Sequence, residues 1–140
     1  MQQKLENISV LLVEDNMVDV MGIQRAFGQA KLNNRIVVAS DGREALEKMR
    51  DGKSIARPYM VLLDLNMPRM NGIEFLKEVR RDPVLRSTVV FVLTTSAASE
   101  DKSKAYDQNV AGYIVKGKAE GSFINTAELF DYYTKVVDLP

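Results

Sequence analysis

Five side chains that can handle a phosphoryl group follow short apolar runs of the sequence. They are Glu14, Asp15, Asp64, Thr94 and Lys116. Clustered carboxylates raise one another's pKa, so three of them cannot all stay ionised without a counter-charge. A divalent cation supplies that charge, and Mg²⁺ suits a few oxygen ligands that leave room for water and phosphate oxygens. The sequence therefore predicts a Mg²⁺ site that receives phosphate, provided that the five side chains lie together.

Asp64 is the candidate nucleophile of this site, because a carboxylate can take a phosphoryl group as an acyl phosphate without a base to activate it. Lys116 and the Thr94 hydroxyl would then neutralise and hydrogen-bond the phosphoryl oxygens. Each residue also has a plain structural explanation. Taken alone, carboxylates before a helix more often cap it, and a threonine or lysine after a strand is usually a turn residue or a solvated charge. The chemical interpretation is favoured because all five residues are expected at one edge of the same sheet.

The elements that must position these side chains are five short apolar runs, the last of them weaker. They span residues 8–13, 35–39, 59–63, 88–93 and 112–115. Runs this short, apolar at nearly every position and rich in β-branched residues, are typical of strands buried on both faces. The runs therefore predict a parallel sheet that is covered by helices.

Apolar residues at helical spacing occupy the segments between the strands. They are Val20, Ile23, Phe27 and Ala30; Ile73, Leu76 and Val79; and Phe123, Ala127, Phe130, Tyr133 and Val137. Residues 99–109 form a further candidate helix with Ser99 as its cap, but only Ala105 and Tyr106 offer apolar contact, so this helix should be loosely held.

The alternation of strands and helices predicts an α/β fold, a flavodoxin-like (βα)5 doubly wound sandwich with a parallel five-stranded sheet in the order 2-1-3-4-5. In such a fold the ligand site lies at the carboxyl ends of the strands, near the switch between strands one and three. The five side chains named above follow strands at this edge.

Composition limits the class of protein. The chain has 140 residues, 19 basic and 19 acidic side chains, and neither histidine nor cysteine. This length is expected to form one domain. The missing residue types exclude Ser/His and Cys/His catalytic pairs, and any metal must be held by oxygen. Zero net charge argues against nucleic acid as a partner, and the sequence has neither a membrane-length apolar run nor a signal peptide at residues 1–7, so we expect a soluble cytoplasmic protein.

Four segments resemble the receiver domain of bacterial two-component response regulators. They are VLLVEDN, VLLDLNMPRMNG, VVFVLTTSA and GYIVK, which begin at residues 10, 61, 89 and 112. The run Asp64-x-x-Met67-Pro68-x-x-x-Gly72 is a strong signature of that family. The resemblance covers nearly the whole chain, and the spacings from Asp64 to Thr94 and from Thr94 to Lys116 each fit one βα unit of its fold.

The resemblance implies a role for each site residue. Asp64 would be the phosphoacceptor, and Mg²⁺ would be held by Glu14, Asp15 and Asp64 with the backbone carbonyl of Asn66. Thr94 and Tyr113 would be the switch pair, and Lys116 would contact the phosphoryl group. The phosphoryl donor would be a sensor histidine kinase or a phosphotransfer protein. The protein would then be no enzyme but a phosphoacceptor that only assists its own phosphorylation and dephosphorylation.

A receiver domain over residues 1–140 with no effector domain would be a single-domain response regulator. The chain is most similar to the small regulators paired with bacterial phytochromes, in its DN-x-x-DV start at Asp15, its LTTS segment and its last helix ending in VV-x-LP. Output would then require a change of surface at the candidate helix of residues 99–109, the fifth strand and the last helix. That face, with Phe130, Tyr132 and Tyr133 on the last helix, is the expected docking or homodimer surface. Of these three, Phe130 and Tyr133 are expected to pack on the sheet instead, and Tyr132 less so.

Two departures from the family pattern stand beside Lys116 and Thr94. Gly117 replaces the usual proline after the lysine, which leaves the conformation of that loop open. Thr95 replaces a small residue, and its bulk is expected to crowd access to the phosphoryl group.

Three other functions compete with this interpretation. A receiver-like interaction module that works without phosphorylation would not need the intact residue set. A haloacid dehalogenase-type phosphatase would need an acid where Asn66 stands, and in a flavodoxin the carboxylates Glu14 and Asp15 would repel the cofactor phosphate.

Overall fold

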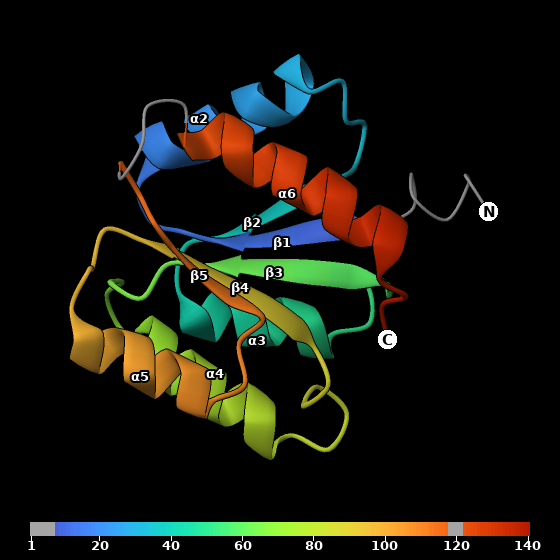
Figure 1. The fold of residues 1–140 in the computed structure, drawn as a ribbon. Helices are drawn as coiled ribbons and strands as arrows, with labels where there is room; N and C mark the ends of the chain where they lie inside the picture. Colours follow the sequence, from blue (N-terminus) through green and yellow to red (C-terminus); the bar gives the residue numbers. More distant parts are fainter. Residues whose placement is uncertain (1–7, 118–121) are drawn as a thin grey trace.

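A parallel sheet of five strands in the order β2-β1-β3-β4-β5 forms the centre of the molecule, as the apolar runs predict. The computed structural model describes residues 8–117 and 122–140 (Figure 1). The strands are β1 (Ser9–Val13), β2 (Ile36–Ala39), β3 (Tyr59–Leu63), β4 (Val89–Thr94) and β5 (Gly112–Val115). The helices are α2 (Met17–Gln29), α3 (Gly42–Arg50), α4 (Gly72–Arg81), α5 (Ser99–Asp107) and α6 (Ser122–Val136). The predicted flavodoxin-like fold and strand order are confirmed. The prediction that residues 1–7 contain no signal peptide concerns residues outside those described.

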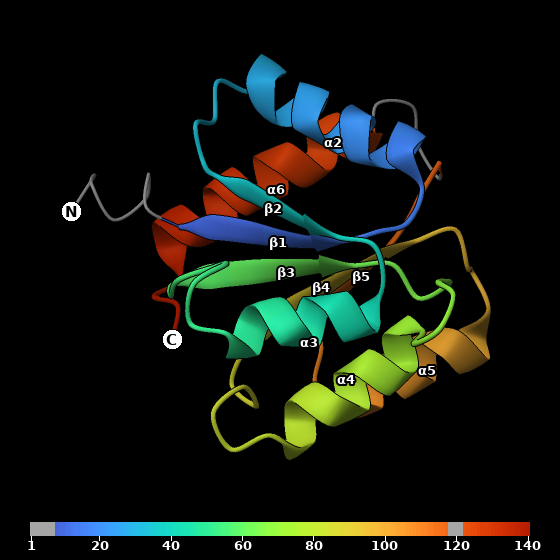
Figure 2. The ribbon, with the colours of Figure 1, turned by 180° about the vertical axis from the view of Figure 1, so that it is seen from behind.

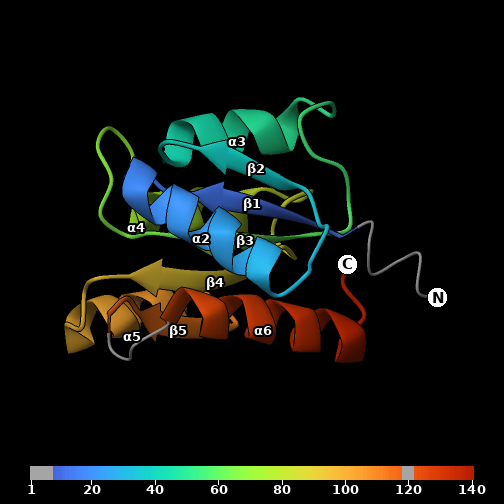
Figure 3. The ribbon, with the colours of Figure 1, turned by 90° about the horizontal axis from the view of Figure 1, so that it is seen from above.

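Helices cover both faces of the sheet (Figures 1 and 2). Successive side chains of a strand point to opposite faces, so Val10 and Leu12 pack with α2 and α6, whereas Leu11 and Val13 pack with α3 and α4. Both faces are therefore apolar, which explains why the strands read as continuous apolar runs rather than as alternating patterns. Figure 3 shows β5 at the edge of the sheet, where α5 and α6 lie beside it.

Side-chain caps begin three of the helices. Asn16 accepts hydrogen bonds from the backbone of α2, Asp41 accepts one from Glu44 in α3, and Asn71 forms a capping box with Glu74 in α4. Such caps satisfy backbone N–H groups that have no partner within the helix. The capping residues lie in the loops that follow β1, β2 and β3, and they define where each helix begins.

The start of α5 differs from the prediction. Ser99 is not a cap but the first helical residue, and the extended residue before it is Ala98, whose side chain has no acceptor atom. Ala105 is the buried residue of this helix, and Tyr106 is 45% exposed. The helix is therefore held by few apolar contacts, as its sequence predicts.

The aromatic side chains of α6 divide between the core and the surface. Phe130 is buried against Phe27 of α2, and the rings of Tyr133 and Phe91 of β4 pack in a T-shaped arrangement. Tyr132, by contrast, is 69% exposed. Phe130 and Tyr133 thus stabilise the sandwich, and Tyr132 is the aromatic residue of the three that remains on the surface.

Candidate functional site

The parallel strands bring the predicted residues to one edge of the sheet. Val13 of β1 stands opposite Leu63 of β3, so Glu14 and Asp64 leave adjacent strands at the same level. The backbone N–H of Asp64 donates to the carbonyl of Val13 over 3.0 Å. On the other side, the N–H of Lys116 donates to the carbonyl of Thr94 over 2.7 Å. The strand register therefore places carboxylates, hydroxyl and ammonium around one point.

Three carboxylates meet at this point. Ligand oxygens of Glu14, Asp15 and Asp64 all lie within 4.8 Å of one another. Glu14 and Asp64 are buried, whereas Asp15 is exposed. Burial, together with the nearby charge of Asp64, raises the pKa of Glu14 to about 7, although the hydrogen bond from Lys116 opposes this shift. The cluster thus has an excess of negative charge and a donor set of hard oxygen atoms, which fits a divalent cation.

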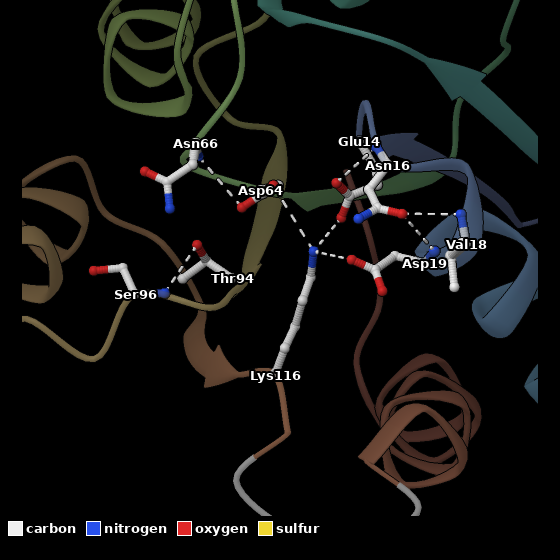
Figure 4. Close-up of polar contacts among 9 residues, drawn as sticks. All are labelled: Glu14, Asn16, Val18, Asp19, Asp64, Asn66, Thr94, Ser96 and Lys116. Carbon is white, nitrogen blue, oxygen red and sulfur yellow. Dashed lines mark hydrogen bonds and ion pairs between the residues drawn. The ribbon is translucent and has the colours of Figure 1, made fainter.

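Lys116 is the cation at the centre of the site (Figure 4). Its ammonium donates hydrogen bonds to Glu14 and to Oδ2 of Asp19, the latter over 2.9 Å, and lies 3.8 Å from Oδ2 of Asp64. Burial opposes the charged form of Lys116, but its bonds to Glu14 and Asp19 and the charge of Asp64 raise its pKa above the ordinary value. A single buried ammonium therefore lies among three carboxylates.

Asp19 is a site residue that the sequence reasoning missed. It lies on the first turn of α2, five residues beyond Glu14, rather than directly after a strand. Asp19 belongs to the DN-x-x-DV start, which resembles that of a subfamily but predicts no contact with the site. Helical geometry could have indicated this contact, because a helix that begins at the sheet edge keeps the side chains of its first turn close to that edge.

The loop between β3 and α4 carries Asn66 and is held tightly. Asn66 is exposed, and its backbone N–H donates to Oδ1 of Asp64 over 3.3 Å. A Cβ atom on Gly72 would stand 2.7 Å from both the Asp64 carbonyl oxygen and the Leu65 Cα, so only glycine fits at the end of the loop. Arg69, with a φ of 63°, forms an ion pair with buried Asp41. These contacts fix the backbone on which the predicted carbonyl ligand lies.

The predicted switch pair meets at Ser96. Thr94 is fully buried, and its Oγ1 accepts a hydrogen bond from the Ser96 N–H over 3.4 Å. The Tyr113 hydroxyl donates to the Ser96 carbonyl over 2.9 Å. Thr94 and Tyr113 are thus joined through one residue of the loop between β4 and α5. Thr95, next to them, is exposed.

A groove of about 880 Å³ opens beside Lys116, between α5, β5 and α6. Its lining includes Lys102, Tyr113 and Leu129. Gly117, at its rim, has a φ of 70°, a conformation that glycine adopts without strain, and the cis peptide bond found in the described residues is Arg57–Pro58. The groove lies on the face that the sequence analysis assigned to output.

Arg80 connects α4 to the far end of α5. Its guanidinium donates to the carbonyl oxygens of Gln108 and Asn109, just beyond α5, over 2.6 and 3.1 Å. It also donates to the carbonyls of Arg86 and Thr88, before β4, over 2.7 and 2.8 Å. One side chain therefore holds the loops at the amino ends of β4 and β5.

Comparison with known proteins gives consistent matches. The family of response regulator receiver domains matches residues 10–128. The chain is 41% identical over 109 residues to the probable methanogenesis regulatory protein FilR2 of Methanothrix harundinacea, covering 76% of this chain and 70% of FilR2. It is 30% identical to the response regulator Rcp1 of Synechocystis, covering 94% of this chain and 92% of Rcp1.

Solved structures match over almost the full chain. The phosphorylated cyanobacterial phytochrome response regulator RcpA superimposes with a TM-score of 0.85 and 33% identity, covering 96% of this chain and 99% of RcpA. The Mn²⁺-bound form of Rcp1 superimposes with a TM-score of 0.83 and 28% identity, covering 95% of this chain and 99% of that one. Among the described residues, no helix has the length and apolar character needed to cross a membrane.

Proposed function

Because the chain belongs to the response regulator receiver domain family, we propose that it accepts a phosphoryl group on Asp64 from a sensor histidine kinase or a phosphotransfer protein. The observation that carries this proposal is the placement of Asp64 at the strand edge, between two further carboxylates and the Lys116 ammonium. The chain covers 92% of Rcp1 and 99% of RcpA, which supports action as a single receiver domain.

The transfer needs few groups from the chain. An Asp64 carboxylate oxygen attacks phosphorus, a P–O bond forms, and the P–N bond of the donor phosphohistidine breaks as its imidazole leaves with the electron pair. The product is an acyl phosphate on Asp64, and a carboxylate can take a phosphoryl group without a base to activate it. Since the phosphoryl group stays on the protein's own side chain, the protein acts as a phosphoacceptor rather than as an enzyme.

Glu14, Asp15 and Asp64, with the backbone carbonyl of Asn66, would hold the metal, for which we propose Mg²⁺. The hard oxygen donors of the carboxylate cluster support this assignment, as does the Mn²⁺-bound form of the similar protein Rcp1. When bound, a divalent cation neutralises charge on the phosphoryl oxygens during transfer.

Lys116 and Thr94 would hold the phosphoryl oxygens in place. The Lys116 ammonium lies 3.8 Å from Oδ2 of Asp64, so an oxygen attached through that carboxylate comes within its reach. The Thr94 hydroxyl accepts from the Ser96 N–H and keeps its own O–H, which can donate to a phosphoryl oxygen once the side chain turns toward Asp64. Thr95 follows Thr94 and is exposed, and its bulk would limit access to the phosphoryl group for water and donors.

Output would begin at Ser96. When Thr94 turns toward the phosphoryl group, the hydrogen bond from the Ser96 N–H is lost, and the Ser96 carbonyl that holds the Tyr113 hydroxyl is free to shift. Phosphorylation would thus bias an existing equilibrium of α5 and β5 rather than build a new structure.

Incubation with acetyl phosphate tests the proposal. With Mg²⁺, intact-mass measurement should show the addition of one phosphoryl group, and EDTA should prevent it because the carboxylates would then repel the donor. A chain that gains no mass under any of these conditions would contradict phosphorylation and favour the unphosphorylated interaction module.

We also propose that two copies associate through the face formed by α5, β5 and α6. Tyr132 and Leu129 are exposed on α6, and large exposed apolar side chains favour contact with a partner. Light scattering with beryllofluoride, a mimic of the acyl phosphate, should show a dimer that Tyr132→Ser weakens. A mass that stays monomeric in both states at high concentration would contradict self-association.

A further inference from the structure

Asp19 contacts the lysine of the site from outside the carboxylate cluster (Figure 4). Its Oδ2 lies 2.9 Å from the Lys116 ammonium. The first turn of α2 holds it there, because Asn16 caps that turn and accepts a hydrogen bond from the Asp19 N–H. The ligand oxygens that converge belong to Glu14, Asp15 and Asp64, and Asp19 is not among them. Asp19 can therefore affect the site through Lys116 without serving as a metal ligand.

The carboxylates around Lys116 compete for one ammonium. A lysine has three N–H donors, and here two are directed to Glu14 and Asp19. Asp64, at 3.8 Å, is beyond hydrogen-bond distance. The Lys116 side chain is only 7% exposed, so water screens this competition weakly. The phosphoacceptor thus has the weakest contact with the cation that it needs.

We propose that Asp19 restrains Lys116, holding its ammonium on the α2 side of Asp64 and so limiting phosphorylation. This inference rests on the proposed function of Asp64. Two effects of Asp19 have the same sign: its bond to Lys116 competes with the phosphoryl oxygens, and its negative charge repels them. Asp19 is a positioning residue, since it acts on the phosphoryl group through the lysine.

Asp19→Asn and Asp19→Ala test this restraint, and they separate charge from orientation. Asparagine keeps an oxygen that can accept from Lys116 but removes the charge, whereas alanine removes both. At saturating Mg²⁺, both variants should gain phosphate from acetyl phosphate about two- to fivefold faster than the natural chain, the size expected for one partly exposed ion pair. Both should also bind beryllofluoride at lower concentration. Asp131→Asn breaks a similar carboxylate–lysine pair, with Lys135 on α6, and should label like the natural chain.

A spectroscopic measurement reports the contact itself. The ¹⁵N signal of the Lys116 ammonium, assigned with Lys116→Arg, should shift in Asp19→Asn and remain in place in Asp131→Asn. Thermal unfolding checks that the substitutions leave the fold intact, because a general loss of structure would slow labelling rather than speed it.

The outcomes separate this inference from the proposed function. If the natural chain is labelled at Asp64 but Asp19→Asn is labelled no faster, then Asp19 does not restrain Lys116, and the assignment of Asp64 as phosphoacceptor is retained. If only Asp19→Ala slows labelling, Asp19 orients Lys116 for the reaction, which also overturns the restraint. If the natural chain is never labelled, the phosphoacceptor and the restraint both fail.

Discussion

Replacing Asp64 with asparagine is expected to abolish phosphorylation completely. The amide has the shape of the carboxylate but is not a nucleophile toward phosphorus, and the loop between β3 and α4 has no other carboxylate. Intact-mass measurement after incubation with acetyl phosphate and Mg²⁺ should show one added phosphoryl group on the natural chain and none on Asp64→Asn. Asp131→Asn, the matched change of a half-buried carboxylate on α6, should be labelled normally.

The same variant has a second readout that does not depend on a phosphodonor. The charge of Asp64 is one cause of the raised pKa of Glu14, so Asp64→Asn should lower that pKa from about 7 toward its ordinary value of 4.5. Carboxyl ¹³C titration by NMR measures this change. Labelling of Asp64→Asn at the level of the natural chain would remove Asp64 from its assigned role, whatever the pKa of Glu14.

Replacing Asp15 with asparagine should weaken Mg²⁺ binding by about tenfold or more, since it removes a charged oxygen ligand from a cluster of three. Calorimetric titration of the natural chain and the variant measures the loss. Asp15 is exposed, and its removal relieves repulsion from Glu14 and Asp64, so the free energy of unfolding in urea should stay equal or rise.

Asp131→Asn is again the control, because it removes one negative charge from the chain without touching the cluster. Its Mg²⁺ affinity should match that of the natural chain. Equal affinities in all three proteins would exclude Asp15 from the metal site and would leave Glu14 and Asp64 as its remaining carboxylates.

The fold was predictable because strand burial leaves a simple signal. Residues with β-branched and apolar side chains at nearly every position mark strands covered on both faces, and the edge of a parallel sheet then follows from chain order. Glu14, Asp64, Thr94 and Lys116 could be placed at that edge because each adjoins a strand end. Because the strands are parallel, their carboxyl ends lie at the same edge of the sheet, and this brings the four residues together.

What could not be predicted depends on side chains that reach the site from other elements. Asp19 arrives by way of a helical turn, and Arg69 reaches Asp41 across two loops. Ser99 is a different kind of error. Its residue type is typical of a helix cap, but the helix begins at Ser99 itself, and the cap position is occupied by Ala98. Rotamers and loop paths decide such contacts, and local sequence patterns do not specify them.

The contacts of Arg80 give α5 two ends of unequal freedom. At Gln108 and Asn109 the chain is bonded to a partly buried guanidinium, whereas at Ala98 the helix starts with no side-chain cap. The beginning of α5 is instead bonded to the loop before it, because the Ser96 hydroxyl donates to Asp101 and accepts from the Ala98 N–H. We therefore expect a shift of the Ser96 loop to move the beginning of α5 more than its end at Arg80, which would change the tilt of the helix.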